Sequence, residues 1–405
     1  MHLRCSNPGC AATLDLHDRA LSCPVCADLL EVVVDNSAST PGELKRMWLE
    51  RRCSHSPLDT SGVWRFREFL PNRYSTVVTM SEGNNPLLRG KKTGEWAGLR
   101  NLSFKHLGWN PTACFKDLGM TTGITEAVFV GAKAVGCAST GNTAASLAAY
   151  AARAGLVAQV YLPAGQVSQN KLAQALDFGA EVVQVEGSFD LALERLLGVT
   201  SGDLYFLNSI NPFRLEGQKT VMFEMLEQLG WEAPDYLVVP GGNLGNTSAF
   251  GKALVELQAA GLLDKLPRLI VVQAEGANPF ARMWRSGSSE LVPVEHPETV
   301  ATAIRIGNPR SWKKALRAVQ HTNGCVMEVT DEEIAEAKAM VGRDGIGCEP
   351  ASATTLAALR KLTARGQIDR DAVVVAILTG HALKDTDFIL KSQALQHAVV
   401  GEVYS

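Results

Sequence analysis

Short apolar runs alternate with amphipathic stretches along the chain from about Leu102 onward. The runs are rich in Val, Ile and Leu, and the stretches between them carry apolar residues at helical spacing. This alternation predicts the strands of parallel sheets joined by crossover helices. We expect strands at residues 135–138, 157–162, 181–185, 205–207, 236–239, 268–274, 326–329 and 372–378. The expected helices include residues 143–154, 170–178, 190–197, 216–229 and 331–341.

These strands are more than one sheet comfortably holds. A chain of 405 residues is also too long for one ordinary hydrophobic core. We therefore predict an α/β protein with two open, mainly parallel sheets in two domains, and a site between the domains. Ahead of this region, residues 29–34 form an apolar run that predicts a strand, and residues 43–50 have the pattern of a helix.

The composition is that of a soluble globular protein, with 46% apolar and 20% charged residues. The net charge of −3 gives no electrostatic reason to expect nucleic acid or an anionic membrane as a partner. No apolar run approaches the roughly 20 residues that a membrane helix needs. The first residues carry neither the apolar core of a signal peptide nor the pattern of a transit peptide, so we expect a cytoplasmic protein.

Four of the nine cysteines fall within the first 26 residues, in the pattern Cys5-x4-Cys10-x12-Cys23-x2-Cys26. Two thiolate pairs joined by a short hairpin can converge on one tetrahedral zinc ion. The alternative is a small flap of four reduced thiols without metal. We favour zinc, because so small a module needs a staple to hold it together. The segment has few basic residues, which favours a structural role over nucleic-acid binding.

A lysine and a glycine-rich loop suggest a cofactor. Lys116 follows the turn-forming stretch 110–115, and Gly241-Gly242-Asn243-Leu244-Gly245-Asn246 lies between an expected strand and a helix that begins near Thr247. An aldehyde that bears a phosphate needs both an amine, for a Schiff base, and a backbone cradle for the dianion. The pairing therefore suggests pyridoxal phosphate (PLP). The spacing G-G-x-x-G does not match the dinucleotide-binding fingerprint, although Asp264 lies at a suitable distance for one.

Small polar residues follow another expected strand, at Ser139-Thr140-Gly141-Asn142-Thr143. Their hydroxyl, amide and backbone donors are placed to point into a cleft. The alternative is that Asn142 or Thr143 simply caps the following helix. The sequence does not decide between the two.

Two further strand ends carry polar groups. Asn208, Ser209 and Arg214 form a suitable set for a second oxyanion such as a phosphate ester, although a solvated turn is the alternative. Thr379 could offer a neutral hydroxyl to a pyridine nitrogen, or belong to an ordinary turn at a strand end. We expect His381, nearby, to be structural.

These stretches together resemble the threonine synthases, which are PLP enzymes of fold type II. The resemblance covers nearly the whole chain and rests on seven motifs in the family's order: NPT-x-x-FKD, STGNTAAS, NS-x-NP-x-RLEGQKT, GGN-x-GN, ATAIRIGNP-x-SW, EPASA and TGH-x-LKD. The cysteine segment is similar to that of a subset of these enzymes. The resemblance implies a fold like that of the tryptophan synthase β subunit. We expect domains at 1–38 (zinc ribbon), 39–105 with 208–405 (large, PLP-binding) and 106–207 (small).

The resemblance also implies roles for individual residues. Lys116 would carry PLP as a Schiff base and serve as the base, Asn142 would bind the phenolic oxygen, and Thr379 would face the pyridine nitrogen. Residues 242–246 would hold the cofactor phosphate. The substrate's carboxylate and nearby groups would be bound by Ser139, Thr140 and Thr143. The phosphate of the substrate, O-phospho-L-homoserine, would be bound by Asn208, Ser209 and Arg214. The product would be L-threonine, and the enzyme a homodimer.

Five positions depart from the family's usual residues. Ala113-Cys114 stands where Gly-Ser is common, Leu118 replaces an arginine, Asn85 a threonine and Ala382 a glycine. Two of them, Cys114 and Asn85, lie near the expected cleft and bear on the choice of substrate. The alternatives are therefore a cysteate synthase, a threonine dehydratase-like enzyme and, outside catalysis, an inactive paralogue of threonine synthase.

Overall fold

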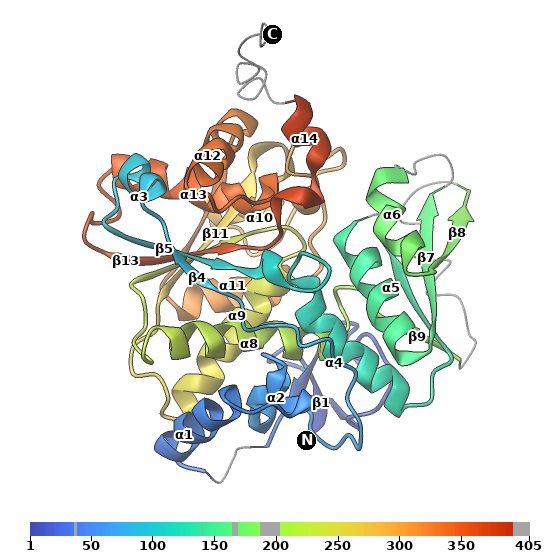
Figure 1. Ribbon diagram of the computed structural model, residues 1–405. Coiled ribbons are helices and arrows are strands. Elements are labelled where there is room, and N and C mark those ends of the chain that lie inside the picture. Colours follow the sequence, from blue (N-terminus) through green and yellow to red (C-terminus); the bar gives the residue numbers. More distant parts are fainter. Residues whose placement is uncertain (36–38, 140, 164–168, 187–202, 392–405) are drawn as a thin grey trace, which may run out of the picture.

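Two parallel sheets and one small antiparallel sheet organise the chain (Figure 1). The computed structural model describes residues 1–405 apart from 36–38, 140, 164–168, 187–202 and 392–405. The helix expected at 190–197 lies outside the described residues. Within the described ranges, no helix has the length and apolar character needed to cross a membrane.

The antiparallel sheet belongs to the N-terminal cysteine segment. It has the order β2-β1-β3, from β1 (His2–Cys5), β2 (Thr13–Leu14) and β3 (Leu30–Val33). Its small core is formed by Leu3, Cys5, Leu16, Cys23, Leu30, Val32 and, from far along the chain, Phe213. Three short helices then lead to the first parallel sheet: α1 (Pro41–Arg52), α2 (Pro57–Thr60) and the 3-10 helix η1 (Trp64–Phe69).

The larger parallel sheet has six strands in the order β12-β11-β10-β13-β5-β4. Only the edge strand β4 (Leu87–Arg89) is antiparallel to its neighbour. The other strands are β5 (Asn101–His106), β10 (Tyr236–Pro240), β11 (Arg268–Ala274), β12 (Cys325–Val329) and β13 (Val373–Leu378). Because β12, β11, β10, β13 and β5 all run parallel to one another, their carboxyl ends share one edge of the sheet.

Helices cover both faces of this sheet, and the strands are apolar on both sides as a result. Leu237 and Val239 of β10 belong to one core, and Val238 between them belongs to the other. The first core is covered by α8 (Pro212–Gln228), α9 (Gly245–Ala259), α10 (Pro279–Ser286) and α11 (Trp312–His321). The second is covered by α3 (Lys92–Ala97), α12 (Asp331–Arg343) and α13 (Pro350–Ala364).

The smaller parallel sheet has four strands in the order β8-β7-β6-β9 and lies apart from the larger one (Figure 1). Its strands are β6 (Ala134–Ala138), β7 (Val157–Pro163), β8 (Glu181–Val185) and β9 (Leu204–Phe206). The helices α4 (Lys116–Phe129), α5 (Asn142–Ala154) and α6 (Gln169–Asp177) accompany it. The remaining elements are the 3-10 helices η2 (Leu107–Trp109), η3 (Glu275–Ala277), η4 (Thr302–Ile304) and η5 (Ala382–Lys384), and α14 (Thr386–Lys391).

The predicted fold class is confirmed: the chain is α/β with two mainly parallel sheets and a small N-terminal sheet that carries the four cysteines. Every expected strand is present, with ends that differ by at most one residue. One central strand, β5, was not predicted. Its second half contains Lys105 and His106, whose polar side chains are fully buried here and conceal the strand's apolar pattern.

Candidate active site

Every predicted loop follows the carboxyl end of a parallel strand. The loop of residues 110–115 that leads to Lys116 (the lysine loop) comes after β5. The loop at Ser139 follows β6, and the loop at Asn208 follows β9. The glycine-rich loop follows β10, and Thr379 follows β13. Carboxyl ends of parallel strands are where α/β proteins bind their ligands. The arrangement therefore places the candidate residues at the ligand-binding edges of both parallel sheets.

The lysine loop is joined directly to the loop that carries Thr379. The Phe115 amide donates to the Thr379 carbonyl at 2.9 Å, and the His381 amide donates to the Ala113 carbonyl at 3.0 Å. A β-bridge between Cys114 and Gly380 lies between these two bonds. Ala113 adopts a left-handed φ of 62°, a conformation that costs a non-glycine residue energy and that this pairing maintains.

Lys116 is the first residue of α4, and its Nζ lies 4.4 Å from the centre of the Phe115 ring. Burial, and after it the positive charge of Arg214, lower the pKa of Lys116 to about 8. An ordinary lysine pKa is near 10.4. A substantial fraction of the amine is therefore neutral near physiological pH, as a nucleophile or base requires.

The start of α4 is fixed by a buried carboxylate next to the lysine. Asp117 accepts hydrogen bonds from the Thr112 amide at 2.7 Å, the Thr112 hydroxyl at 2.6 Å and the Ser146 hydroxyl at 2.5 Å. Burial raises its pKa to about 6, against the effect of these bonds. Asp117 thus ties the lysine loop and α5 together below Lys116.

The loop after β6 does not have the conventional helix cap that the sequence left open. The N-cap of α5 is Gly141, and no side chain caps its first turn. Instead, Asn142 Nδ2 donates to Glu349 Oε2 at 3.0 Å, across 207 residues of sequence. Ser139 and Thr143 are half-buried, whereas Thr140 lies outside the described residues. The amide of Asn142 is therefore directed towards the larger sheet's loops.

Glu349 is a buried residue of the site that the sequence did not reveal. Its second oxygen, Oε1, accepts a hydrogen bond from the Thr379 hydroxyl at 3.0 Å, so one carboxyl group reaches both Asn142 and Thr379. Burial raises its pKa. The available signal was the motif EPASA, which lies at the start of α13 and served only to mark the resemblance.

The glycine-rich loop leads into a helix whose first turn lacks a side-chain cap. Leu244 takes a left-handed φ of 63° as the N-cap of α9, and no side chain caps the first amides. Asn246 Oδ1 and Thr247 Oγ1 are buried and have no hydrogen-bond partner within the described structure. A Cβ on Gly242 would approach Ile304 to 3.2 Å, so a larger residue would press against its neighbour. Uncapped amides and an unpartnered hydroxyl at a helix start suit an oxyanion.

The loop after β9 lies beside the glycine-rich loop. Asn208 Oδ1 accepts a hydrogen bond from the Ala138 amide at 3.1 Å, which ties the loop to the end of β6. Asn243 Nδ2 donates to the Ser209 hydroxyl, and Asn243 Oδ1 accepts a bond from the Arg310 amide at 2.6 Å. Two loops that the sequence assigned to different phosphates are therefore in direct contact.

Arg214 is buried, with 1% of its surface exposed. Its Nη1 donates to the Leu207 carbonyl at 3.2 Å, but Nε and Nη2 have no partner among the described residues. Burial lowers the pKa of Arg214 to about 10, so it stays cationic at neutral pH. A buried guanidinium with unpartnered donors and no paired carboxylate among the described residues is costly, because its charge is not compensated within the protein. The solvated turn considered from the sequence is wrong for this residue.

Close helix packing places Arg214 next to the helix that carries the lysine. A Cβ on Gly119 would lie 2.8 Å from the Arg214 carbonyl oxygen, and one on Gly123 would lie 3.2 Å from Arg214 Cγ. On the other helix, a Cβ on Gly217 would overlap the carbonyl of Leu118. The three glycines let α4 and α8 approach closely, which accounts for the effect of Arg214 on the pKa of Lys116.

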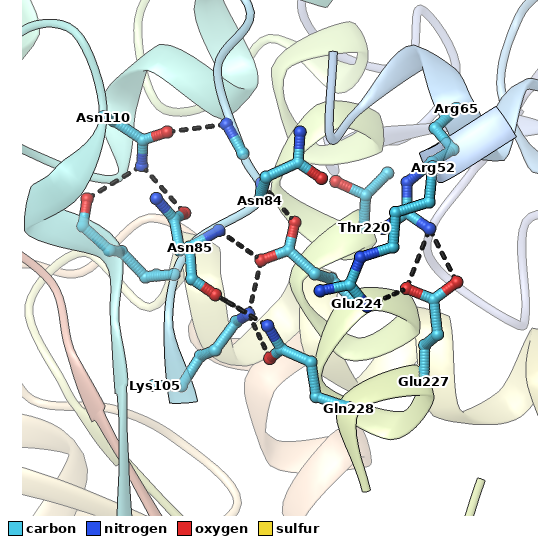
Figure 2. A network of polar contacts seen from close by, with 12 residues as sticks. Arg52, Arg65, Asn84, Asn85, Lys105, Asn110, Thr220, Glu224, Glu227 and Gln228 are labelled. Atoms are coloured by element: carbon cyan, nitrogen blue, oxygen red, sulfur yellow. Dashed lines mark hydrogen bonds and ion pairs between the residues drawn. The ribbon is translucent and has the colours of Figure 1, made fainter. Parts of the chain in front are cut away.

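A buried polar network joins Lys105, Glu224, Gln228 and Asn85 to Asn110, at the start of the loop that leads to Lys116 (Figure 2). Lys105 Nζ donates to the Asn85 carbonyl and to Gln228 Oε1, each at 2.7 Å, and forms an ion pair with Glu224. Glu224 accepts bonds from the backbone amides of Asn84 and Asn85. Asn110 Nδ2 then bonds to Asn85 Oδ1 at 3.1 Å (Figure 2). The network therefore connects β5 and α8 to the start of the lysine loop.

The four N-terminal cysteines form a candidate metal centre. Their Sγ atoms all lie within 4.8 Å of one another, with 3.4 Å between Cys5 and Cys26 and 3.6 Å between Cys10 and Cys23. Zinc–sulfur bonds of about 2.3 Å in a tetrahedron place sulfur atoms about 3.8 Å apart, so the set fits one zinc ion. The residue after each pair, Ala11 and Ala27, has a left-handed φ of 52° and 59°.

Two parallel sheets with a lysine and a glycine-rich loop at their carboxyl edges are the architecture of a PLP-dependent enzyme. The family model described as "Pyridoxal-phosphate dependent enzyme" matches residues 78–380. Among solved structures, the match to threonine synthase from Escherichia coli spans 100% of this chain and 92% of the Escherichia coli chain. Its TM-score is 0.71 at 19% sequence identity. The match to threonine deaminase isoform 2 from Solanum lycopersicum spans 93% of this chain and 99% of the deaminase chain, with a TM-score of 0.66 at 20% sequence identity. These two show the fold.

Relatives of similar sequence identify which kind of PLP-dependent enzyme this chain resembles. Threonine synthase from Methanocaldococcus jannaschii is 46% identical over 386 residues, which are 95% of this chain and 93% of the relative. Threonine synthase from Methanosarcina acetivorans is 44% identical over 391 residues, or 96% and 93% of the two chains. The protein belongs to the threonine synthase family of PLP-dependent enzymes.

Proposed function

We propose that the protein converts O-phospho-L-homoserine and water to L-threonine and phosphate. The observation that carries this choice of substrate is Arg214, a buried cation with two unpartnered donor atoms beside the lysine helix. A dehydratase acting on a free amino acid has no second phosphate to bind there. The relatives that are 44–46% identical support the same activity.

The residues present fit PLP. Lys116 would hold the cofactor covalently, Asn142 would bind its phenolic oxygen and Thr379 would face its ring nitrogen. Residues 242–246 would hold its phosphate, for which the uncapped start of α9 and the unpartnered Thr247 hydroxyl offer donors. When bound, PLP supplies an electron sink that stabilises negative charge at the substrate's α-carbon.

Separate groups of this chain would bind the two ends of the substrate. We propose that Ser139, Thr140 and Thr143 receive the carboxylate, and that Asn208, Ser209 and Arg214 receive the phosphate. The guanidinium supplies a fixed charge and two directed donors, which suit a phosphate dianion. In this role Arg214 also stabilises the phosphate as it leaves the γ-carbon, before water adds at the β-carbon.

Lys116 is the residue that we propose moves protons. Once its amine is free, it takes the proton from the α-carbon, and the lowered pKa of about 8 leaves it able to do so near neutral pH. Asp117 holds the first turn of α4 and so fixes where that amine can reach. Water has to be excluded early and admitted late, so we expect the smaller sheet's domain, residues 106–207, to close over the larger one.

The sequence predicted three further properties that we retain as proposals. The four cysteines bind a structural Zn²⁺, the protein is a homodimer, and it works in the cytoplasm. The division into a ribbon at 1–38, a large domain at 39–105 with 208–405, and a small domain at 106–207 is also a proposal. The convergence of the four Sγ atoms supports the first of these.

Phosphate release from O-phospho-L-homoserine, with threonine identified in the product, tests the proposed activity. The matched control is Lys116→Ala, which should lose both the visible cofactor band and turnover. If cysteate forms from phosphoserine and sulfite instead, the protein is a cysteate synthase. Ammonia release from threonine indicates a dehydratase. A protein that binds PLP and acts on none of these is an inactive paralogue.

A further inference from the structure

A short chain of hydrogen bonds links the residues proposed to face two edges of the cofactor ring. Ser352 Oγ accepts from the backbone amides of Thr379 at 2.8 Å and Gly380 at 3.2 Å, and lies 2.9 Å from Thr379 Oγ1. Thr379 Oγ1 in turn lies 3.0 Å from Glu349 Oε1, and Glu349 Oε2 accepts from Asn142 Nδ2. The order is therefore Ser352, Thr379, Glu349, Asn142.

Counting donors and acceptors decides how the protons are arranged. A serine oxygen has two lone pairs, and here the two backbone amides occupy both, so the Ser352 hydroxyl proton is directed to Thr379 Oγ1. The Thr379 proton then has two possible targets, Glu349 or the cleft. An ionised Glu349 accepts that proton. A neutral Glu349 donates its own proton to Thr379 Oγ1, which leaves the Thr379 hydroxyl free to donate into the cleft.

The carboxyl group of Glu349 is packed closely against its neighbours. The group lies against the backbone of Gly380, where a Cβ would come within 2.6 Å of one carboxyl oxygen and 2.7 Å of the other. The Glu349 amide also donates to the Gly380 carbonyl at 3.1 Å. A side chain at Gly380 would therefore displace the Glu349 carboxyl group from its present position.

We propose that Glu349 is a positioning residue that fixes the Asn142 amide and sets the direction in which the Thr379 hydroxyl donates. This rests on the proposed function, in which these two side chains face the ring's phenolic oxygen and its nitrogen. Through Thr379, the state of Glu349 then determines whether the ring nitrogen meets a donor or a lone pair. Glu349 itself touches neither cofactor nor substrate in this proposal.

The surroundings of Glu349 act on its pKa in opposite directions. Burial raises its pKa, while the bonds from Asn142 and Thr379 and the charges of Lys384 and Lys116 oppose the rise. The other titratable groups that interact with it are two buried thiols, Cys114 and Cys348, whose pKa values burial raises to about 12. They stay neutral at physiological pH and add no charge.

Glu349→Gln is the informative variant, because glutamine reproduces the neutral acid permanently. Its carbonyl can accept from Asn142 and its amide can donate to Thr379. In the PLP-loaded protein, the visible spectrum of E349Q should keep the low-pH form of the wild type at every pH where the protein stays folded. Glu349→Ala, which removes both contacts, should lower kcat at least tenfold while KM for O-phospho-L-homoserine changes less than threefold.

The matched control is Glu126→Gln. Glu126 is also a buried carboxyl with a raised pKa, but it bonds to His17 and Tyr74 near the far end of α4. E126Q should titrate as the wild type does. An E349Q spectrum that also titrates as the wild type, or a smaller loss of kcat in E349A, overturns the inference. If E349A does not fold, the E349Q spectrum alone decides.

Failure of the proposed function gives a different result. In that case the wild-type protein binds no PLP, or binds it and releases no phosphate from O-phospho-L-homoserine. Only a wild type that passes both assays, combined with an E349Q that behaves like it, counts against the role of Glu349.

Discussion

Replacing Arg214 tests the substrate phosphate site most directly. The side chain is 1% exposed, and its Nε and Nη2 atoms have no partner in the described part of the chain. A hydrogen bond to a charged group contributes about 1.5–3 kcal/mol, so two such bonds to a phosphate contribute about 3–6 kcal/mol. We take the lower figure, because Asn208 and Ser209 would remain, and expect Arg214→Met to weaken phosphate binding by about 150-fold.

The same variant makes an opposite prediction for stability without ligand. Methionine replaces a buried, uncompensated charge by an apolar chain of similar length, so the thermal unfolding temperature of R214M should equal or exceed that of the wild type. Inorganic phosphate should raise the unfolding temperature of the wild type and leave that of R214M unchanged. Loss of the phosphate effect together with a large fall in stability would instead indicate a purely structural arginine.

The assay that separates the two roles compares ligands with and without a phosphate. Competitive inhibition by inorganic phosphate, and KM for O-phospho-L-homoserine, should weaken strongly in R214M. Binding of L-threonine, followed through the cofactor spectrum, should change less than threefold. The matched control is Arg65→Met. Arg65 is equally buried and its Nε and Nη2 also lack partners among the described residues, but its charge is paired with Glu227 at 2.6 Å, so its loss should lower stability and spare phosphate affinity. Equal losses for phosphate and threonine in R214M would refute the phosphate role.

Three further predictions follow from other sites. Only the neutral amine attacks an aldehyde, and the pKa of Lys116 is lowered to about 8. The rate at which the cofactor-free protein captures PLP should therefore increase with pH up to about 8 and then level off. A rate that keeps rising to pH 10 contradicts the lowered pKa. Removing the proposed zinc ion with a chelator should lower the unfolding temperature, and so should replacing the exposed Cys26 by serine, in both cases as the metal content falls. An unchanged unfolding temperature would show that the four thiols need no ion. Lys105→Met should cost about 3–5 kcal/mol in urea unfolding, since Glu224 is left buried without its cation; a double variant that also carries Glu224→Gln should recover part of that loss.

The sequence predicted the elements whose pattern is local. The runs 236–239 and 268–274 contribute residues such as Val238, Val239, Ile270 and Val271 to the cores on both faces of the larger sheet, so successive positions are apolar and the strands are easy to recognise. Loops after these strands could be assigned to a site because parallel strands end at one edge. The cysteine spacing likewise restricts which thiols can meet, and the four Sγ atoms do converge.

What the sequence could not provide depends on contacts between distant residues. Glu349 has the appearance of an ordinary charged residue before a helix, and only the approach of Asn142, 207 positions earlier, makes it part of the site. Lys105 concealed β5 because its cation is neutralised by Glu224, on a helix far along the chain. In both cases an ionisable side chain is buried among partners that lie far away in the sequence.

Three of the residues that depart from the family's usual ones, Ala113, Cys114 and Asn85, lie at closely packed positions of the site. Ala113 holds a left-handed φ between two backbone bonds to the Thr379 loop, and the neighbouring Cys114 is fully buried. Asn85 Nδ2 is buried without a partner, while its carbonyl oxygens accept bonds from Lys105 and Asn110. None of the three offers a charge or an exposed nucleophile to a substrate. We therefore expect a change at these positions to act through the placement of the loop before Lys116, and to alter the position of the Lys116 amine rather than the reaction that we propose for it.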